Sequence, residues 1–392
     1  MSLTADHMLR MARQQTGLED MGAYGNVHIA GFRRLAESLQ ADDRLSEAGR
    51  RRVQIELFFW LTRYLIFEGD LAAHPEVRAV PMAKPVFIAG FGRTGSTFLH
   101  HLLALDPRFR TPQLWELLHP FPPPRPETYH TDPRIERTRR SIAASLAVSP
   151  EAARLHSMAA QAPDECNWIM RHGPQQLMRY RGLRYWHWLM ALEGDALRQL
   201  YAHYKLQIQF LQLHCRAQHW LGKSIHHQFF LPVLFDVFPD ARVIRLHREP
   251  VHCIPSLATL ALSYRRLYYG SLVDRRELGR WILDFFVENT RRKVDADRSA
   301  PEGRYIDIGY DALIEDPIAA VRRIYRHLGC ELSPAVAESM TAHIARAGAM
   351  YKSGWAHDPA EFGLAAGEIA ERSAGYSSWL SERDLLMADG LR

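Results

Sequence analysis

The chain has 392 residues, of which 47% are apolar, so we expect one large α/β domain with additions or two domains. Its 49 lysines and arginines exceed its 44 acidic residues by only five, without a long run of like charge. This balance excludes a nucleic-acid-binding tail and favours local sites for small anions. No apolar run approaches the ~18 residues of a membrane span, and the four cysteines lack metal-like spacing. We therefore expect a cytoplasmic protein with reduced thiols, no membrane span and no metal site.

The first part of the chain has a helical pattern. Residues 6–74 include the strongly apolar "IELFFWLTRYLIFEGDL", which ends near the breakers Gly69 and Pro75. We predict a helical N-terminal extension over residues 1–80, followed by the main domain over residues 81–392.

A strand, a glycine-rich turn and a helix come next. The apolar run "PVFIA" predicts a strand, and apolar residues at helical spacing follow the turn, namely Phe98, Leu99, Leu102 and Leu103.

Two segments in the middle of the chain differ in character. The closely spaced prolines of residues 119–133 predict a surface loop without regular secondary structure, a candidate cover for a site. Residues 132–216 form a predicted helical insertion rich in Trp and Tyr. This insertion is a candidate acceptor pocket, although core packing explains its aromatic content equally well.

Three further runs, "HWLGKS", "ARVIRLHREP" and "GRYIDIGYDAL", each place a short β-favouring stretch before a polar turn, with helical stretches between them. Alternating strands and helices predict a parallel sheet covered on both faces. Ligands bind such sheets at the carboxyl ends of the strands. The polar turns after Ala89, Leu221 and Leu246 are therefore expected to lie along one edge.

The turn "GFGRTGST" resembles a nucleotide-binding loop that lacks its lysine. Gly90 and Gly95 have the separation of the GxxxxGK[ST] pattern, but Ser96 occupies the lysine position and the cation is Arg93. A triphosphate with Mg²⁺ needs that lysine at its terminal phosphates. A less charged tetrahedral group, such as a phosphosulfate, suits a planar arginine better.

Hydroxyls surround this arginine. Thr94, Ser96 and Thr97 add donors, and the helix that begins near Ser96 directs its first N–H groups at an anion. An ordinary strand-to-helix turn would also use glycines and Ser/Thr caps, so the loop alone favours anion binding only slightly.

"AGFGRTGSTFLHHLLALDP" resembles the 5′-phosphosulfate-binding loop of sulfotransferases that use 3′-phosphoadenosine 5′-phosphosulfate (PAPS), especially the bacterial type with arginine in the loop. The resemblance implies a P-loop-related, three-layer α/β fold with a central parallel sheet flanked by helices. It also implies PAPS as co-substrate, without a metal, and covers roughly residues 84–364.

A second motif follows the strand "ARVIRL". Arg248 stands at the strand end, and Ser256 comes eight residues later on the next helix. In the sulfotransferases that this chain resembles, such a pair binds the 3′-phosphate of the donor. Two motifs in the right order make a salt-bridging Arg and an ordinary helix Ser a poor alternative explanation.

Weaker similarities complete the pattern. "GKSIHH" is similar to the K-S-P-x-H segment of the family, with Lys223 and His227 in place and Ile225 where proline is usual. "MYKSGWAHDPAEFGL" is similar to a basic loop that closes over the nucleotide, which makes Lys352 a candidate donor ligand.

Catalysis needs charge stabilisation and a base. Arg93 and Lys223 are the expected cations at the transferred group, with Thr94, Gly95, Ser96 and Thr97 as further donor-binding residues. The resemblance offers Glu116 as base, and His227 is its competitor because histidine often accepts protons near neutral pH. The choice between them stays open. Asp164 and Glu165 form another acidic pair, for which helix capping is the simpler role.

The leading hypothesis is a sulfotransferase that acts on a hydroxyl or amine of a small molecule, with an apolar or aromatic alcohol as the class suggested by the Trp- and Tyr-rich region. A nucleotide-dependent kinase or NTPase is the first alternative, disfavoured by Ser96 in place of lysine. A catalytically silent nucleotide-binding protein is the second. The acceptor and the oligomeric state stay open.

Overall fold

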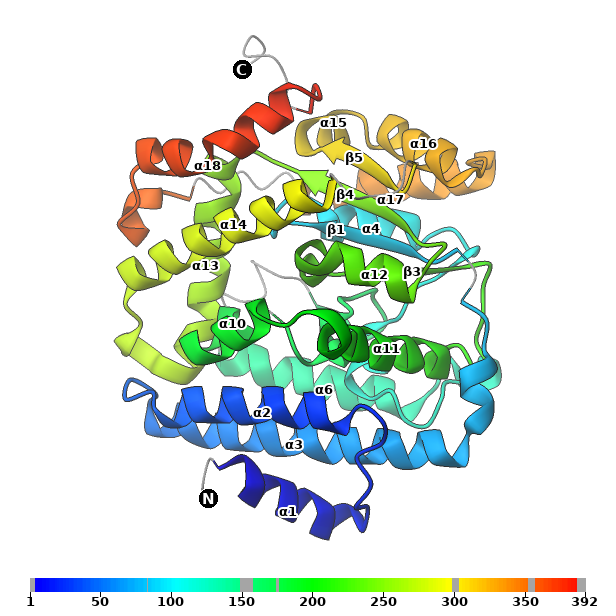
Figure 1. Cartoon of the computed structure of the whole chain (residues 1–392). Coiled ribbons are helices and arrows are strands. Elements are labelled where there is room, and N and C mark those ends of the chain that lie inside the picture. The colour runs from blue at the N-terminus through cyan, green and yellow to red at the C-terminus, as the bar shows by residue number, and fades with distance from the viewer. Residues whose placement is uncertain are drawn as a thin grey trace.

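The computed structural model describes residues 4–82, 84–148, 158–173, 176–297, 303–351 and 357–385. A parallel sheet lies at its centre, and helices surround it (Figure 1). Its strands follow the order β2-β3-β1-β4-β5. Their bounds are β1 (Val86–Gly90), β2 (Phe109–Arg110), β3 (His219–Lys223), β4 (Arg242–His247) and β5 (Tyr305–Gly309).

All four strand pairings are parallel, and the register aligns the carboxyl ends of the three central strands. Gly90 of β1 lies opposite Leu246 of β4, and Ile88 of β1 lies opposite Lys223 of β3. The prediction that the turns after β1, β3 and β4 share one edge of the sheet is confirmed.

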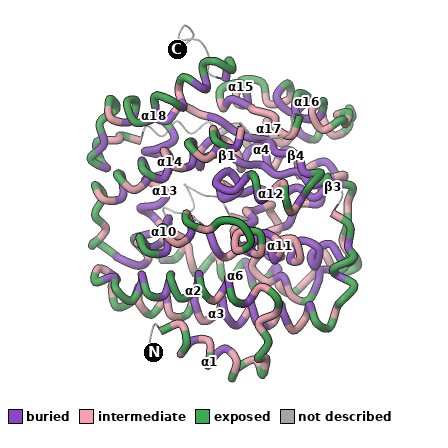
Figure 2. Tube along the Cα trace, viewed as in Figure 1, coloured by how far each residue is buried: buried purple, intermediate pink, exposed green. Residues whose placement is uncertain are grey.

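Strand β1 shows why the sheet is covered on both faces. Phe87 and Ala89 belong to one apolar core, whereas Val86 and Ile88 belong to another. Because successive side chains of a strand point to opposite faces, each face of the sheet supplies one of these cores. Figure 2 shows buried residues concentrated at the sheet and on the inner faces of the helices around it.

One core packs the sheet against helices from the middle and end of the chain, and the other packs it against helices that follow β1 and β5. The first group comprises α11 (Gly194–Leu211), α12 (Leu231–Val237), α13 (Pro250–Tyr269), α14 (Arg275–Asp297) and α18 (Ala366–Ser381). The second comprises α4 (Ser96–Leu103), α15 (Tyr310–Glu315), α16 (Pro317–Leu328) and α17 (Pro334–Tyr351). The predicted three-layer α/β class is confirmed.

The predicted helical extension contains α1 (Ala5–Thr16), α2 (Gly25–Gln40) and α3 (Glu47–Ala73). Their apolar residues share a core with α10 (Leu183–Met190) and α13. The predicted insertion is helical, with α6 (Pro133–Val148), α8 (Asn167–Met170), α9 (Gln176–Arg179), α10 and α11. The division at residue 80 stays a prediction, because both sides of it contribute to one core.

Three of the elements that were not predicted lie between β1 and α6. These are the edge strand β2, the helix α5 (Leu114–Leu118), and a 3₁₀ turn over Pro126–Thr128 inside the proline-rich stretch that was expected to lack regular structure. Proline at the first position of a helical turn removes no needed donor, which permits this turn. Among the helices of the described residues, none combines the length and the apolarity needed to cross a membrane.

Replacing Gly49 by alanine is expected to destabilise the packing of α3 on α13. A Cβ atom at Gly49 would lie 1.8 Å from the backbone oxygen of Tyr268, which cannot move as a flexible side chain would. We expect a loss of about 1–3 kcal/mol in the free energy of unfolding, measured by urea denaturation. Gly367 is the matched control, because nothing lies within 4 Å of a Cβ there. Its change to alanine is expected to stabilise α18 slightly, and equal losses in both variants would contradict the prediction.

Candidate active site

The loop between β1 and α4 has a tightly constrained backbone. Gly90 and Gly95 have φ values of 139° and 84°, and Arg93 adopts 70°, which is uncommon for a residue with a side chain. A Cβ at Gly90 would also meet the Leu246 carbonyl at 2.6 Å. Gly95 caps α4, so the first N–H groups of that helix face the loop. A left-handed arginine costs of order 1–3 kcal/mol, a strain that is typical of functional sites.

The structure brings the two predicted donor motifs together. The Arg93 Nε donates to the Ser256 Oγ at 3.1 Å, and the Arg248 Nη1 donates to the Arg93 carbonyl at 3.1 Å. The Arg248 guanidinium also lies over the ring of Tyr310 at 4.0 Å. Arg93 therefore points to the serine that the sequence assigned to the 3′-phosphate, and Arg248 fixes the loop that carries Arg93.

Positive charge accumulates at this point. Burial, and then the Arg248 charge, lower the pKa of Arg93. His357 accepts or donates a hydrogen bond with the Thr259 Oγ1 at 3.0 Å, and burial followed by Arg93 and Arg248 lowers its pKa. Like charges held together away from water favour a bound anion, which relieves their repulsion.

The hydroxyls of the loop have different roles. The Thr94 Oγ1 donates to the Phe91 carbonyl at 2.8 Å and is buried, so it closes the loop internally. Ser96 and Thr97 occupy the first turn of α4. The Thr97 Oγ1 accepts a hydrogen bond from the Lys223 Nζ at 3.1 Å, which ties the end of β3 to the loop.

Lys223 lies between this threonine and an acidic side chain. Its Nζ is 2.8 Å from the Glu165 Oε1, and the lysine is only 2% exposed. The Glu165 side chain keeps 18% of its surface exposed, and its Oε2 accepts from the Asn167 Nδ2 at 2.9 Å. A carboxylate, an ammonium group and a hydroxyl thus meet at the edge of the sheet where the predicted cations lie.

Charges from both halves of this site act on Tyr264 of α13. Burial raises the pKa of its hydroxyl, Arg179 opposes this shift, and Asp164 and Glu165 add to it, while Arg93 lowers it. The tyrosine therefore lies within the field of both Arg93 and Glu165. It stands eight residues after Ser256 on α13, about 12 Å along the same helix face.

Glu116 has a different environment from the one expected of a base. It is 0% exposed and forms a buried ion pair with Arg110. Its Oε2 also accepts hydrogen bonds from the Gln113 backbone N–H at 2.8 Å and from the Tyr129 hydroxyl at 2.7 Å. These partners lie in β2, just before α5 and in the proline-rich stretch, and none of them is Arg93 or Lys223.

His227 is also fully buried. Its Nδ1 shares a hydrogen bond of 3.2 Å with the Tyr201 hydroxyl, and its ring packs against Phe87 in the core of the sheet. Burial lowers its pKa to about 3, so it is neutral at physiological pH. Lys352 lies outside the described residues. Among the described residues, no group of three or more His, Cys, Asp or Glu side chains could hold a metal ion.

Sequence reasoning missed Tyr264 and His357 and gave Glu165 only a capping role. The spacing of eight residues from Ser256 would have placed Tyr264 on the donor face of α13. The contact between Glu165 and Lys223 has no such signal, because it joins a loop to a strand 58 residues later.

The geometry agrees with comparisons to known proteins. A model of the "Sulfotransferase family" matches residues 85–334. The omega-hydroxy-beta-dihydromenaquinone-9 sulfotransferase Stf3 of Mycobacterium tuberculosis is 28% identical over 251 residues, which cover 62% of this chain and 62% of that protein. The match thus spans less than two thirds of the length of this curated relative.

Two crystal structures resemble nearly the whole chain. Sulfotransferase STF1 of Mycobacterium tuberculosis has a TM-score of 0.83 at 27% identity, covering 95% of this chain and 98% of STF1. Sulfotransferase STF9 of Mycobacterium avium has a TM-score of 0.82 at 26% identity, covering 97% of both chains. The family match covers more than half of the chain and includes the loop, Lys223, Arg248 and Ser256, so the chain belongs to the sulfotransferase family.

Proposed function

We propose that this chain transfers a sulfuryl group from PAPS to a hydroxyl or amine of a small molecule. The observation that carries the proposal is the meeting of Arg93, Arg248 and Ser256 at the carboxyl edge of the sheet. Two arginines and a serine hydroxyl match the charge and the acceptor atoms of a phosphate. The family membership supports the same donor.

The donor would bind along this edge in two places. Arg93, Arg248 and Ser256 suit the 3′-phosphate, and the N-terminus of α4 with Ser96 and Thr97 suits the phosphosulfate. The Arg93 side chain contacts Ser256 at the first of these places, whereas its backbone belongs to the loop that forms the second. Lys223 reaches that place from β3 through Thr97.

In the proposed reaction the acceptor oxygen or nitrogen forms a bond to sulfur, and the bond from sulfur to the bridging phosphate oxygen breaks. The electron pair leaves with adenosine 3′,5′-bisphosphate. Lys223 would stabilise the charge that develops on the transferred group and the leaving oxygen. Arginine and lysine charges supply this stabilisation in the proposal, so we also propose that no metal takes part.

The proton of the acceptor needs a base, and we propose Glu165 for this role in place of Glu116 or His227. Glu165 is partly exposed and lies beside Lys223 at the loop. The Glu116 carboxylate is occupied by Arg110, Gln113 and Tyr129, and burial keeps His227 a weak base inside the core. A base must reach the proton that it accepts, and only Glu165 among these three contacts another residue of the site.

For the acceptor we propose an apolar or aromatic alcohol. The name of Stf3 describes a hydroxyl-bearing quinone as its acceptor. In this chain the aromatic surface near Glu165 comes from Tyr264 and Trp168. The Trp168 ring lies 4.8 Å from the Arg179 guanidinium.

The four cysteines are free thiols, which supports a reducing, cytoplasmic compartment for the proposed enzyme.

Adenosine 3′,5′-bisphosphate is expected to raise the melting temperature of the protein, because a ligand that binds the native state stabilises it. Arg248→Met should weaken this binding by about 10–100-fold, since a charge-assisted hydrogen bond contributes roughly 1.5–3 kcal/mol. Arg372→Met is the matched control, because Arg372 pairs with Asp284 on the surface and touches none of the donor residues. The shift is measured by differential scanning fluorimetry over a range of ligand concentrations.

Each alternative predicts a different result in the same assay. Stabilisation by ATP with Mg²⁺ alone would contradict the proposal and favour a kinase or NTPase. Binding of the bisphosphate without transfer of labelled sulfate to any alcohol or amine would favour the silent binding protein. Activity that survives a metal chelator is expected if arginine and lysine supply the charge.

A further inference from the structure

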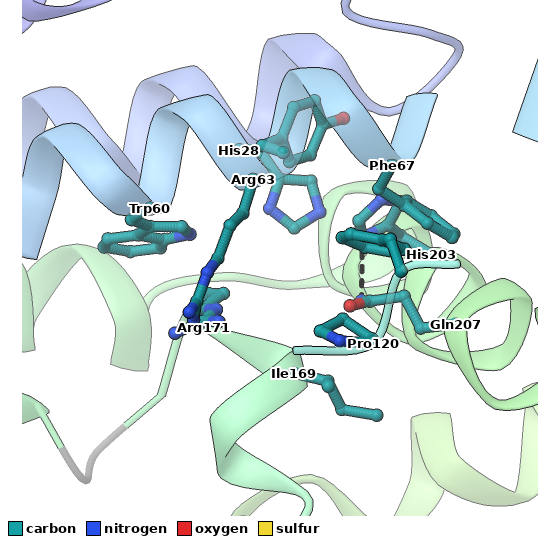
Figure 3. A pocket seen from close by; sticks show the side chains of 11 residues that line it. His28, Trp60, Arg63, Phe67, Pro120, Ile169, Arg171, His203 and Gln207 are labelled. Carbon is teal, nitrogen blue, oxygen red and sulfur yellow. Dashed lines mark hydrogen bonds between the residues drawn. The ribbon is translucent and has the colours of Figure 1, made fainter. Parts of the chain in front are cut away.

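A second concave site lies away from the donor loop, between α2, α3, α11 and the proline-rich stretch (Figure 3). The cavity has a volume of about 20 Å³, which is room for one or two waters or a group of that size. No residue that lines it belongs to the donor motifs.

Two arginines point into this cavity. Arg171 is the residue that follows α8. Figure 3 shows the Arg63 side chain extending from α3 toward the Arg171 side chain. The Arg63 Nη2 lies 3.1 Å from the His119 Nδ1. Within the described part of the chain, the Arg171 guanidinium has neither a hydrogen-bond partner nor an acidic partner.

The environment of these arginines disfavours two uncompensated charges. Burial, and then the charges of Arg63 and Arg179, lower the pKa of Arg171. Burial, and then Arg137, lower the pKa of Arg63 to about 10. Both side chains are only partly exposed, and like charges held close together in such a place favour a bound anion that relieves their repulsion.

His28 adds a third group to the same cavity. It is 4% exposed, it lines the cavity, and neither of its ring nitrogens has a hydrogen-bond partner. Burial lowers its pKa well below the usual value, so the neutral ring offers one N–H donor. A buried polar group without a partner is uncommon and indicates a ligand or water at that place.

No aspartate or glutamate is among the described residues that line the cavity. The Glu68 Oε1 is 3.1 Å from the Nε2 of His203, which does line it. Arg171 also has a left-handed backbone, with φ 62° and ψ −52°, an unusual and strained conformation for arginine. The backbone strain and the unpaired guanidinium occur in the same residue.

We propose that this cavity binds a small anionic group of carboxylate size, held by Arg63, Arg171 and the ring of His28. Its volume excludes a nucleotide, which separates this site from the donor site. The group is either a free anion or the carboxylate of the acceptor. Only the second source rests on the proposed sulfotransferase activity.

Formate is the probe for the site, because it is the smallest carboxylate. Sodium formate should raise the melting temperature saturably, by about 2 °C at ten times its dissociation constant, with ionic strength held by a bulky sulfonate buffer. Arg171→Met and Arg63→Met should each abolish this rise. Without formate, Arg171→Met should melt no lower than the wild type, because it removes a charge that Arg63 and Arg179 repel.

Arg181→Met is the matched control. Arg181 pairs with Asp42 and Glu277 outside the cavity, so this variant should melt lower than the wild type and keep the full formate response. Equal formate shifts in all variants, or no shift in the wild type, would overturn the proposal. A bromide-soaked crystal gives a second measurement, in which an anomalous peak between Arg63 and Arg171 is expected and its absence counts against the site.

Enzyme kinetics separate the two sources of the anion. Hydroxy-carboxylic acids of increasing length are compared as acceptors with the alcohols that lack the carboxylate. A lower KM for the acid that disappears in Arg171→Met assigns the anion to the acceptor, whereas equal KM values with retained formate binding assign it to a free ion. The bisphosphate shift should persist in both arginine variants, so loss of the anion site and failure of donor binding are distinguishable.

Discussion

Glu165→Gln is expected to lower kcat by about 10²–10⁴-fold, the usual contribution of a general base. Glutamine has the shape of glutamate and keeps the contact with the Asn167 side chain through its amide oxygen, but it accepts no proton. The affinity for adenosine 3′,5′-bisphosphate should change little, because the donor-binding Arg93, Arg248 and Ser256 remain.

A loss of kcat can also arise if Lys223 shifts when its carboxylate partner is replaced. The pH profile separates these causes. Loss of a base removes the acidic limb of the profile of kcat/KM, whereas a displaced lysine lowers the rate at every pH. Asp284→Asn is the control, because Asp284 is an exposed carboxylate that pairs with Arg372 on the surface. An unchanged kcat in Glu165→Gln would eliminate Glu165 as the base.

The sequence predicted the elements that carry the donor site because their signals are local. The four longer strands are short β-favouring runs before polar turns, and α4 begins at Ser96 as its spacing indicated. Parallel strands then bring their carboxyl ends to one edge, which explains why Arg93, Lys223 and Arg248 were expected near each other. The contact of Arg93 with Ser256 could not be predicted from the sequence. A long arginine side chain on this loop can turn toward the position of the phosphosulfate or toward that of the 3′-phosphate.

The residues that sequence reasoning missed are placed by packing between distant segments. Glu165 meets Lys223 because the chain returns to the end of β3, where the Lys223 carbonyl accepts from the Cys166 N–H at 2.9 Å. Arg171 and Arg63 meet because the N-terminal helices pack on the insertion. Strand β2 has only two residues, too few to show a period.

Glu116→Gln is expected to lower the free energy of unfolding by about 3–5 kcal/mol, the cost of leaving one charge of a buried ion pair without its partner. Burial disfavours the Arg110 charge, but Glu116 and Tyr129 outweigh this and raise the pKa of Arg110. Without the carboxylate the guanidinium stays charged and buried, while Gln113 and Tyr129 lose a charged acceptor. Urea denaturation measures the loss, and kcat per folded molecule should stay within about tenfold of the wild type.

The double variant Arg110→Met/Glu116→Leu tests the same reasoning from the other side. Replacing both charges by apolar residues of similar size is often close to neutral, so much of the stability lost in Glu116→Gln should return. The rate should return with it, because neither residue contacts Lys223 or Arg93. If kcat falls by more than about 10²-fold while the free energy of unfolding is unchanged, Glu116 is the base after all. The opposite result is a large loss of stability in Glu116→Gln with an active folded fraction. It would show that Glu116 stabilises the fold around α5, and Glu165 would remain the carboxylate beside the transferred group.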